Sequence, residues 1–240
     1  MAKRPIASVV ADFDNVVSLL TERGILEKTP SAKVLANAKQ IHSSTYSLII
    51  WRFRLKHLQP QGKVFVDEIA SDALQILPQV LMGYSKTASL LTRGIIENVL
   101  RHIYFTDHLI EFGRMNKGPK WYLSMEDLFS YAKNHPDFER TEPRFDAIAK
   151  LATLYGDLSA SVHGRAVKDL ETRIALGRIK YEDDIGTKHV DAVKKCAEAV
   201  NFLLAIFHRE KVHKFQAEDK RIILRSMPTP ARAIWKQFDD

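Results

Sequence analysis

Two arginines and one glutamate follow one another at four-residue spacing within residues 85–112, the segment with the most regular helical apolar pattern. They are Arg93, Glu97 and Arg101. On a helix this spacing keeps the three side chains on one face, opposite a broad apolar face. One interpretation is a solvated ladder of ion pairs, each worth about 0.2–0.5 kcal/mol. The other is a cationic strip, held in place by the glutamate, that binds phosphate groups.

A serine and a histidine share a face at the end of another apolar-patterned segment, residues 141–162. Ser159 and His163 stand four residues apart, and Gly164 follows them. The helix dipole stabilises a histidine at this end as a cation, which suits proton transfer near neutral pH. The alternative is a histidine that hydrogen-bonds the last carbonyls before a glycine cap.

Basic and aromatic residues alternate in a third segment, Trp51-Arg52-Phe53-Arg54-Leu55-Lys56-His57. Such a segment can stack bases on its aromatic rings and contact phosphates through Arg52, Arg54 and Lys56. It is also typical of a helix end at which Trp51 and Leu55 belong to the core and the cations face the helix dipole.

The charge distribution favours contact with nucleic acid. The chain has a net charge of +7 and a pI near 9.4. Residues 1–60 contain nine basic and four acidic side chains, residues 208–236 contain eight and three, and the middle is close to neutral. Clustered basic residues commonly release counterions from phosphates, so RNA or DNA is an expected partner.

Several chemistries are not expected from the sequence. It contains no glycine-rich phosphate loop, dinucleotide fingerprint or nucleophile elbow, so we expect no cofactor. No two histidines stand four residues apart, which disfavours a helical metal site. The single cysteine, Cys196, indicates a reducing, cytoplasmic location. No apolar run reaches the ~18–20 residues that cross a bilayer, so we expect no membrane association.

The apolar periodicity predicts an all-α helical bundle without a sheet. We expect helices over residues 5–23, 30–57, 63–82, 85–112, 121–132, 141–162, 186–207 and 217–225. The predicted organisation is a basic helical extension over residues 1–60 that packs on the bundle, the bundle itself over 61–226, and a C-terminal tail over 227–240.

Residues 90–108, LLTRGIIENVLRHIYFTDH, and 154–164, LYGDLSASVHG, together resemble the HEPN superfamily of small prokaryotic α-helical proteins, especially its abortive-infection and defence-associated branches. The resemblance covers roughly residues 85–210. It implies a HEPN-like bundle, often dimeric, that serves in a phage-defence or toxin–antitoxin system. In active members of this superfamily, a metal-independent ribonuclease site forms at the dimer interface. There an arginine four to six residues from the histidine contacts the scissile phosphate, and the histidine transfers a proton at the 2′-oxygen.

The chain departs from this pattern at the arginine. The corresponding positions, 156–158, are Gly156, Asp157 and Leu158. The cation would then come from Arg93, Arg101 or Arg165, and Asp157 would orient the imidazole.

The resemblance therefore implies two functions. In the first, the protein is an endoribonuclease with His163, Arg93, Glu97, Arg101 and Ser159 in its site. Arg165 then contacts RNA together with Arg52, Arg54 and Lys56. In the second, it is a non-catalytic component that binds RNA or a partner protein. The expected partners are RNA and either a second copy of the chain or a protein of the same system. An unrelated helical scaffold is the third alternative.

Overall fold

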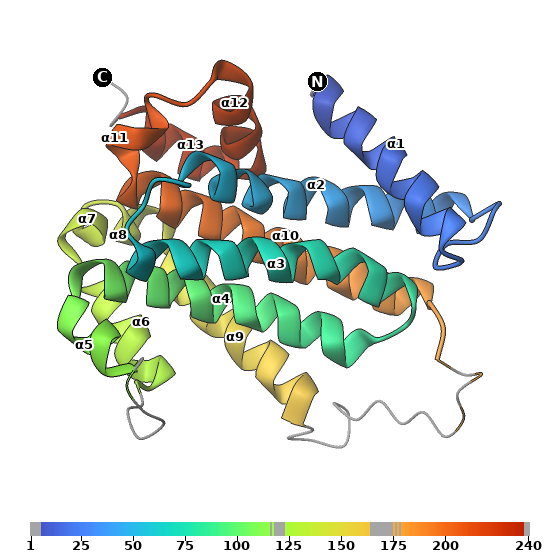
Figure 1. Cartoon of the computed structure of the whole chain (residues 1–240), viewed down its shortest axis with the longest axis horizontal. Helices are drawn as coiled ribbons and strands as arrows, with labels where there is room; N and C mark the ends of the chain where they lie inside the picture. The colour runs from blue at the N-terminus through green and yellow to red at the C-terminus, as the bar shows by residue number, and fades with distance from the viewer. Residues whose placement is uncertain are drawn as a thin grey trace.

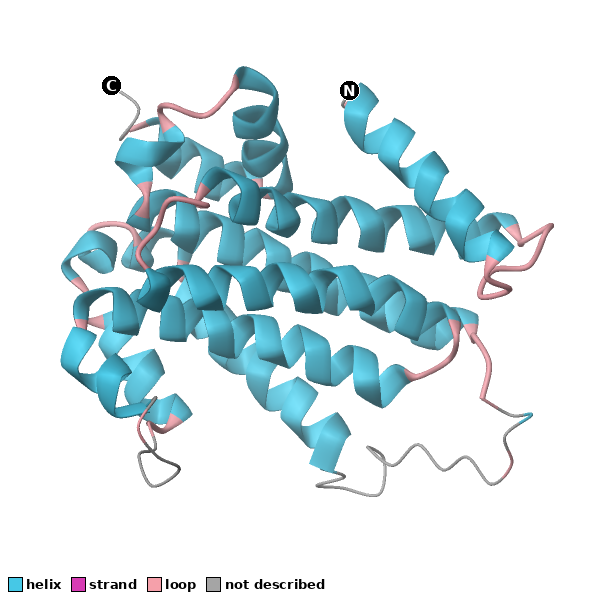
Figure 2. Ribbon diagram, viewed as in Figure 1, coloured by secondary structure: helices cyan, strands magenta, loops and turns pink. Residues whose placement is uncertain are grey.

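The computed structural model describes residues 6–115, 117, 123–163, 175, 177 and 179–237. Within these ranges every regular element is a helix and none is a strand (Figure 2). The prediction of an all-α bundle is therefore confirmed for the described part of the chain. None of the helices there is long and apolar enough to cross a bilayer.

Four long helices and one shorter helix make the centre of the bundle (Figure 1). The long helices are α2 (Ala32–Arg54), α3 (Pro60–Leu81), α4 (Ser85–Asp107) and α10 (Asp183–Phe207). Helix α9 (Ala147–His163) packs against α4 and α10. Each contributes an apolar stripe to one continuous core, with Leu48, Ile69, Ile96 and Leu203 fully buried. Burial of such stripes is the main stabilising contribution in a bundle of this kind.

The expected boundary at residue 60 does not separate an extension from a bundle. Helix α2 lies between α3 and α10 and is part of the centre. Helix α1 (Ala7–Glu22) packs outside the central helices, against α2 (Figure 1). The segment Pro60-Gln61-Gly62, which lies between the helices expected over 30–57 and 63–82, instead begins α3, because proline is favoured at the first helical position.

Two predicted helices are each divided in the structure. The first is α4, which ends at Asp107, and a short α5 (Leu109–Met115) follows. The second consists of α8 (Glu142–Phe145) and α9, with Asp146 between them at a φ of 60°. Aspartate tolerates this left-handed conformation better than most residues, and it turns the chain into α9.

Four further helices lie before residue 147 and after residue 207 in the described part of the chain. Helix α6 (Met125–Lys133), expected over residues 121–132, is capped by Ser124 in a capping box with Asp127. Helix α7 (Pro136–Glu139) begins after His135, between the helices expected over residues 121–132 and 141–162. Beyond α10 lies α11 (Arg209–Val212), and the predicted helix 217–225 appears as α12 (Ala217–Ser226).

The prediction of a tail over residues 227–240 is wrong for its described part. Residues Thr229–Lys236 form α13, which buries Ala231, Ile234 and Trp235. Pro230 lies in the first turn of this helix, where a missing N–H costs nothing.

Candidate functional site on helices α4 and α9

The two predicted groups of residues meet where α4 and α9 pack together. The Arg93 guanidinium donates from Nη1 to His163 Nε2 at 3.0 Å. It also donates from Nε to Glu97 Oε1 at 3.0 Å, one turn along α4. Arg93 of α4 and His163 at the end of α9 therefore form one site, although 70 residues separate them in the sequence.

The hydrogen bond between these residues fixes the state of the histidine ring. A guanidinium has donors and no acceptor, so Nε2 of His163 must accept. The ring is then neutral and carries its proton on Nδ1. Since the His163 side chain is exposed, a substrate can reach the ring from solvent.

Glu97 connects both arginines of the strip. Its Oε2 accepts from Arg101 Nη2 at 3.2 Å, while its Oε1 accepts from Arg93. Arg101 also lies 3.5 Å from Asn98 Oδ1. The side chains of Arg93 and Glu97 are 21% and 19% exposed, so the ion pairs of the ladder exist but are largely covered. Two arginines share one glutamate, and a positive charge remains for an anionic ligand.

Tyr155 belongs to this site and was not predicted. Its hydroxyl donates to Glu97 Oε1 at 3.2 Å, and the Arg93 guanidinium lies 4.8 Å from its ring centroid. Burial, followed by the negative charge of Glu97, raises the pKa of Tyr155, so the phenol stays protonated as a donor. The available signal was its spacing, because Tyr155, Ser159 and His163 recur every four residues on α9.

Asp72, on α3, reaches the same strip from the other side. A Cβ at Gly94 would lie 2.5 Å from Asp72 Oδ2, so this glycine is what allows the carboxyl group to approach α4. Burial raises the pKa of Asp72 to about 6, and the charges of Glu68 and Glu97 add to this, whereas a hydrogen bond from Asn98 opposes it. The sequence signal for this contact was a glycine inside an otherwise strong helix.

Two residues expected near the histidine are placed differently. Ser159 lies on the same stripe but is buried, and its Oγ has no hydrogen-bond partner among the described residues. Asp157, expected to orient the imidazole, instead lines a cavity of about 660 Å³ together with Lys195 of α10. Within the described ranges, the partner of His163 is therefore the arginine of α4 and not a carboxylate of its own helix.

The basic and aromatic segment at the end of α2 is largely engaged within the protein. Arg52 pairs with Asp67 at 3.3 Å, and Arg54 pairs with Asp219. Trp51 is buried and donates from Nε1 to Asn201 Oδ1 at 2.8 Å, so it is a core residue and not a stacking platform.

This basic segment is also remote from the histidine. Lys56 is exposed. In Figure 1 the C-terminal ends of α2 and α9 lie on different sides of the bundle. Arg165, the remaining predicted RNA contact, lies outside the described residues.

Neither a metal centre nor a known relative accounts for this arrangement. Within the described ranges, no group of three or more histidine, cysteine, aspartate and glutamate side chains is placed to hold a metal ion. Comparison with protein-family models, with curated proteins and with solved structures finds no match for the chain.

Proposed function

We propose that the protein is a HEPN-like, metal-independent endoribonuclease of a prokaryotic phage-defence or toxin–antitoxin system, with its site at the junction of α4 and α9. The observation that carries this proposal is the 3.0 Å contact between Arg93 Nη1 and His163 Nε2. It places a guanidinium beside an exposed imidazole although the chain lacks arginine at positions 156–158. In this proposal, Arg93 replaces the missing arginine from a different helix.

The guanidinium supplies the electrostatic part of the reaction. A phosphodiester approaching His163 would accept hydrogen bonds from Arg93, whose orientation is held by Glu97 and by the ring of Tyr155. A guanidinium held in this way stabilises the charge that grows on the phosphoryl oxygens without reorganising first. Arg101, fixed by the same glutamate, adds a second positive charge along the strip.

The imidazole supplies the proton transfer. When a phosphate oxygen replaces His163 as the acceptor of Arg93 Nη1, the Nε2 lone pair of the neutral ring becomes available for the proton of the ribose 2′-hydroxyl. The 2′-oxygen then attacks the adjacent phosphorus, the bond to the 5′-oxygen breaks, and solvent protonates the leaving oxygen. The products are a 2′,3′-cyclic phosphate and a 5′-hydroxyl, and no metal is required.

The second candidate function is a non-catalytic module that binds RNA or a partner protein. It is favoured by the residues at 156–158 and by the buried Ser159, which offers no group to solvent. In that case the pair of Arg93 and His163 would simply join two helices.

Incubation of the purified full chain with labelled RNA in EDTA distinguishes the two functions. The nuclease cleaves RNA in the presence of the chelator, and His163→Ala abolishes cleavage while the thermal midpoint stays close to that of wild type. His57→Ala is the matched control, since His57 is also exposed but lies beyond the end of α2. Intact RNA with the wild-type protein, together with a retained gel shift, would support the binding module instead.

A further inference from the structure

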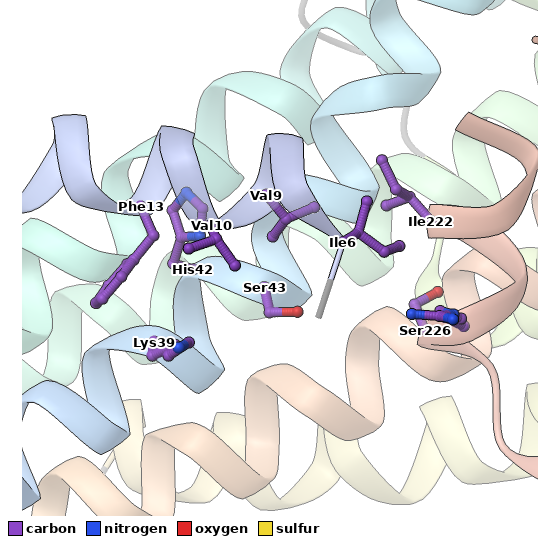
Figure 3. Close-up of a pocket in the computed structure, with 10 residues that line it drawn as sticks. Ile6, Val9, Val10, Phe13, Lys39, His42, Ser43, Ile222 and Ser226 are labelled. Atoms are coloured by element: carbon purple, nitrogen blue, oxygen red, sulfur yellow. The ribbon is translucent and has the colours of Figure 1, made fainter. Parts of the chain in front are cut away.

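A cavity of about 240 Å³ lies between α1, α2 and α12, away from the helices that carry the proposed nuclease site. Figure 3 shows Phe13, Val9, Val10 and Ile6 along α1, with Ile222 and Ser226 on α12. Helix α2 contributes Lys39, His42 and Ser43. At ~30 Å³ for each water molecule, this volume corresponds to about eight waters, or to a ligand of about ten non-hydrogen atoms.

The cavity wall includes a buried histidine with only one of its two ring nitrogens hydrogen-bonded. His42 is 6% exposed, and its Nε2 lies 2.7 Å from Asp12 Oδ2. A carboxylate accepts, so Nε2 carries a proton. Nδ1 has no hydrogen-bond partner among the described residues. A buried polar atom without a partner is costly, and a ligand group at this point would recover that cost.

The orientation of this ring is fixed on two sides. The centroid of Phe13 lies 5.3 Å from that of His42, and the centroid of Tyr46 lies 5.6 Å from it. Together with the Asp12 hydrogen bond, these contacts hold the imidazole in a defined position before a ligand binds. A preorganised polar group in a mostly apolar wall is typical of small-molecule sites.

The charges around the cavity indicate the sign of the ligand. Lys39 and Arg225 contribute two cations to its lining. None of the described residues that line it is acidic. Asp12 pairs with His42, and Glu218 accepts from Ser8 of α1 at 2.6 Å. The apolar part of the wall comes from both α1 and α12, so a ligand would contact the two terminal helices at once.

We propose that this cavity binds a small amphipathic carboxylate. Its hydrocarbon chain lies between α1 and α12, against Val10 and Ile222. Its head group pairs with the ammonium group of Lys39, which lines the cavity together with His42. Binding joins the N-terminal helix to the C-terminal part of the bundle, and it does not depend on the ribonuclease activity proposed above.

Isothermal titration of the full chain with octanoate tests this site, with octanol and octylamine as probes of the head group. We expect octanoate to bind with a Kd below about 1 mM and octanol to bind about tenfold more weakly, because it lacks the charge-assisted contacts. Octylamine should show no binding. An absence of octanoate binding, or equal binding of octanol or octylamine, would overturn the proposal.

Two variants locate the bound ligand. Lys39→Glu should weaken octanoate binding about tenfold or more, whereas Lys86→Glu, at an exposed lysine of α4, should leave it unchanged. Val10→Phe should abolish binding by filling the cavity. His163→Ala should bind octanoate like wild type, which separates this site from the nuclease proposal. Equal effects of Lys39→Glu and Lys86→Glu would place the ligand elsewhere and overturn the assignment.

Discussion

Glu97 is the residue at which the candidate site is held together. It accepts hydrogen bonds from Arg93, Arg101 and Tyr155, and these three donors come from two helices. Its contribution is positional, since its carboxylate points at other protein groups and not at a substrate. The strip of Arg93, Glu97 and Arg101 could be predicted from spacing alone. The spacing of Tyr155 indicated its helix face, but its contact with Glu97 could not be predicted, because 58 residues separate the two.

Replacing Glu97 by glutamine tests this positional role. Glu97→Gln keeps the shape but weakens two charge-assisted hydrogen bonds, so both arginines lose their fixed orientation. We expect the cleavage rate to fall about tenfold or more while substrate affinity changes less, since orientation matters most in the transition state. Single-turnover kinetics measures the two separately.

Asp191→Asn is the matched control for this variant. It removes an exposed (i, i+4) ion pair with Lys195, at 2.7 Å, on α10. It should change neither the cleavage rate nor the affinity. If Glu97→Gln behaves like this control, Glu97 does not position the arginines.

The raised pKa of Asp72 predicts that the free energy of unfolding depends on pH. Its pKa is raised from 3.8 to about 6, so the folded state holds this proton more tightly than the unfolded state does. The corresponding stabilisation is complete below pH 3.8 and is lost as the pH rises through 6. After allowance for solvent screening of a partly exposed group, the change amounts to about 1 kcal/mol.

Asp72→Asn removes this titration while retaining a polar side chain beside Gly94. The free energy of unfolding of the variant, relative to wild type, should therefore rise by about 1 kcal/mol between pH 4 and pH 7.5. Urea unfolding at the two pH values measures this difference. If the difference in free energy of unfolding stays constant across that range, burial and the acidic neighbours do not raise the pKa of Asp72.

At the level of elements, α4 and α10 are joined by a buried pair of histidines. His102 Nε2 lies 2.7 Å from His208 Nε2, and His102 Nδ1 lies 2.9 Å from the Gly62 carbonyl oxygen of α3. The carbonyl must accept, so His102 carries its proton on Nδ1 and its Nε2 accepts from His208. Both rings are therefore neutral in this arrangement. Burial lowers the pKa of His102 to about 4 and also lowers that of His208.

The pair makes the bundle sensitive to acid. A lowered pKa in the folded state gives stability that is present above pH 6.5 and is lost as the pH falls toward 4. For His102 alone the fall from 6.5 to about 4 corresponds to about 3 kcal/mol, and about 2 kcal/mol of this is lost by pH 5. His208→Gln, whose amide can still donate to His102, should lose less stability between pH 7.5 and pH 5 than wild type does.

Urea unfolding at pH 7.5 and pH 5 measures this difference as well. His57→Gln is the control, because His57 is exposed and should leave the acid sensitivity at its wild-type value. Identical acid sensitivity of His208→Gln and wild type would contradict the assignment of two neutral rings.

Helices that are defined by local interactions could be predicted from the sequence, whereas those that depend on contacts distant in sequence could not. Apolar periodicity predicted the long helices, and the helix expected over residues 121–132 is present as α6 (Met125–Lys133). The break at Asp146 was not predicted, because a left-handed residue leaves no periodic signal. Helix α13 was missed because the prolines at 228 and 230 look like a release of the chain, whereas the burial of Trp235 depends on tertiary packing.

At the level of the whole molecule, the two basic ends of the chain meet. Ser8 of α1 contacts Glu218 of α12, and Arg54 at the end of α2 pairs with Asp219. The excess of basic residues in both segments was readable from the sequence, but their proximity was not. Part of this charge is neutralised inside the protein, so net charge alone overstated the surface that is open to nucleic acid.

In the proposed ribonuclease, Arg93 and His163 act as one unit, and a double-mutant cycle on RNA cleavage in EDTA tests this most directly. The cycle compares Arg93→Ala, His163→Ala and the double variant with wild type. If the two residues form one catalytic site, each single variant loses nearly all activity and the double variant is no worse than either. Full cleavage by either single variant, or independent and additive losses, would contradict a shared site at the junction of α4 and α9.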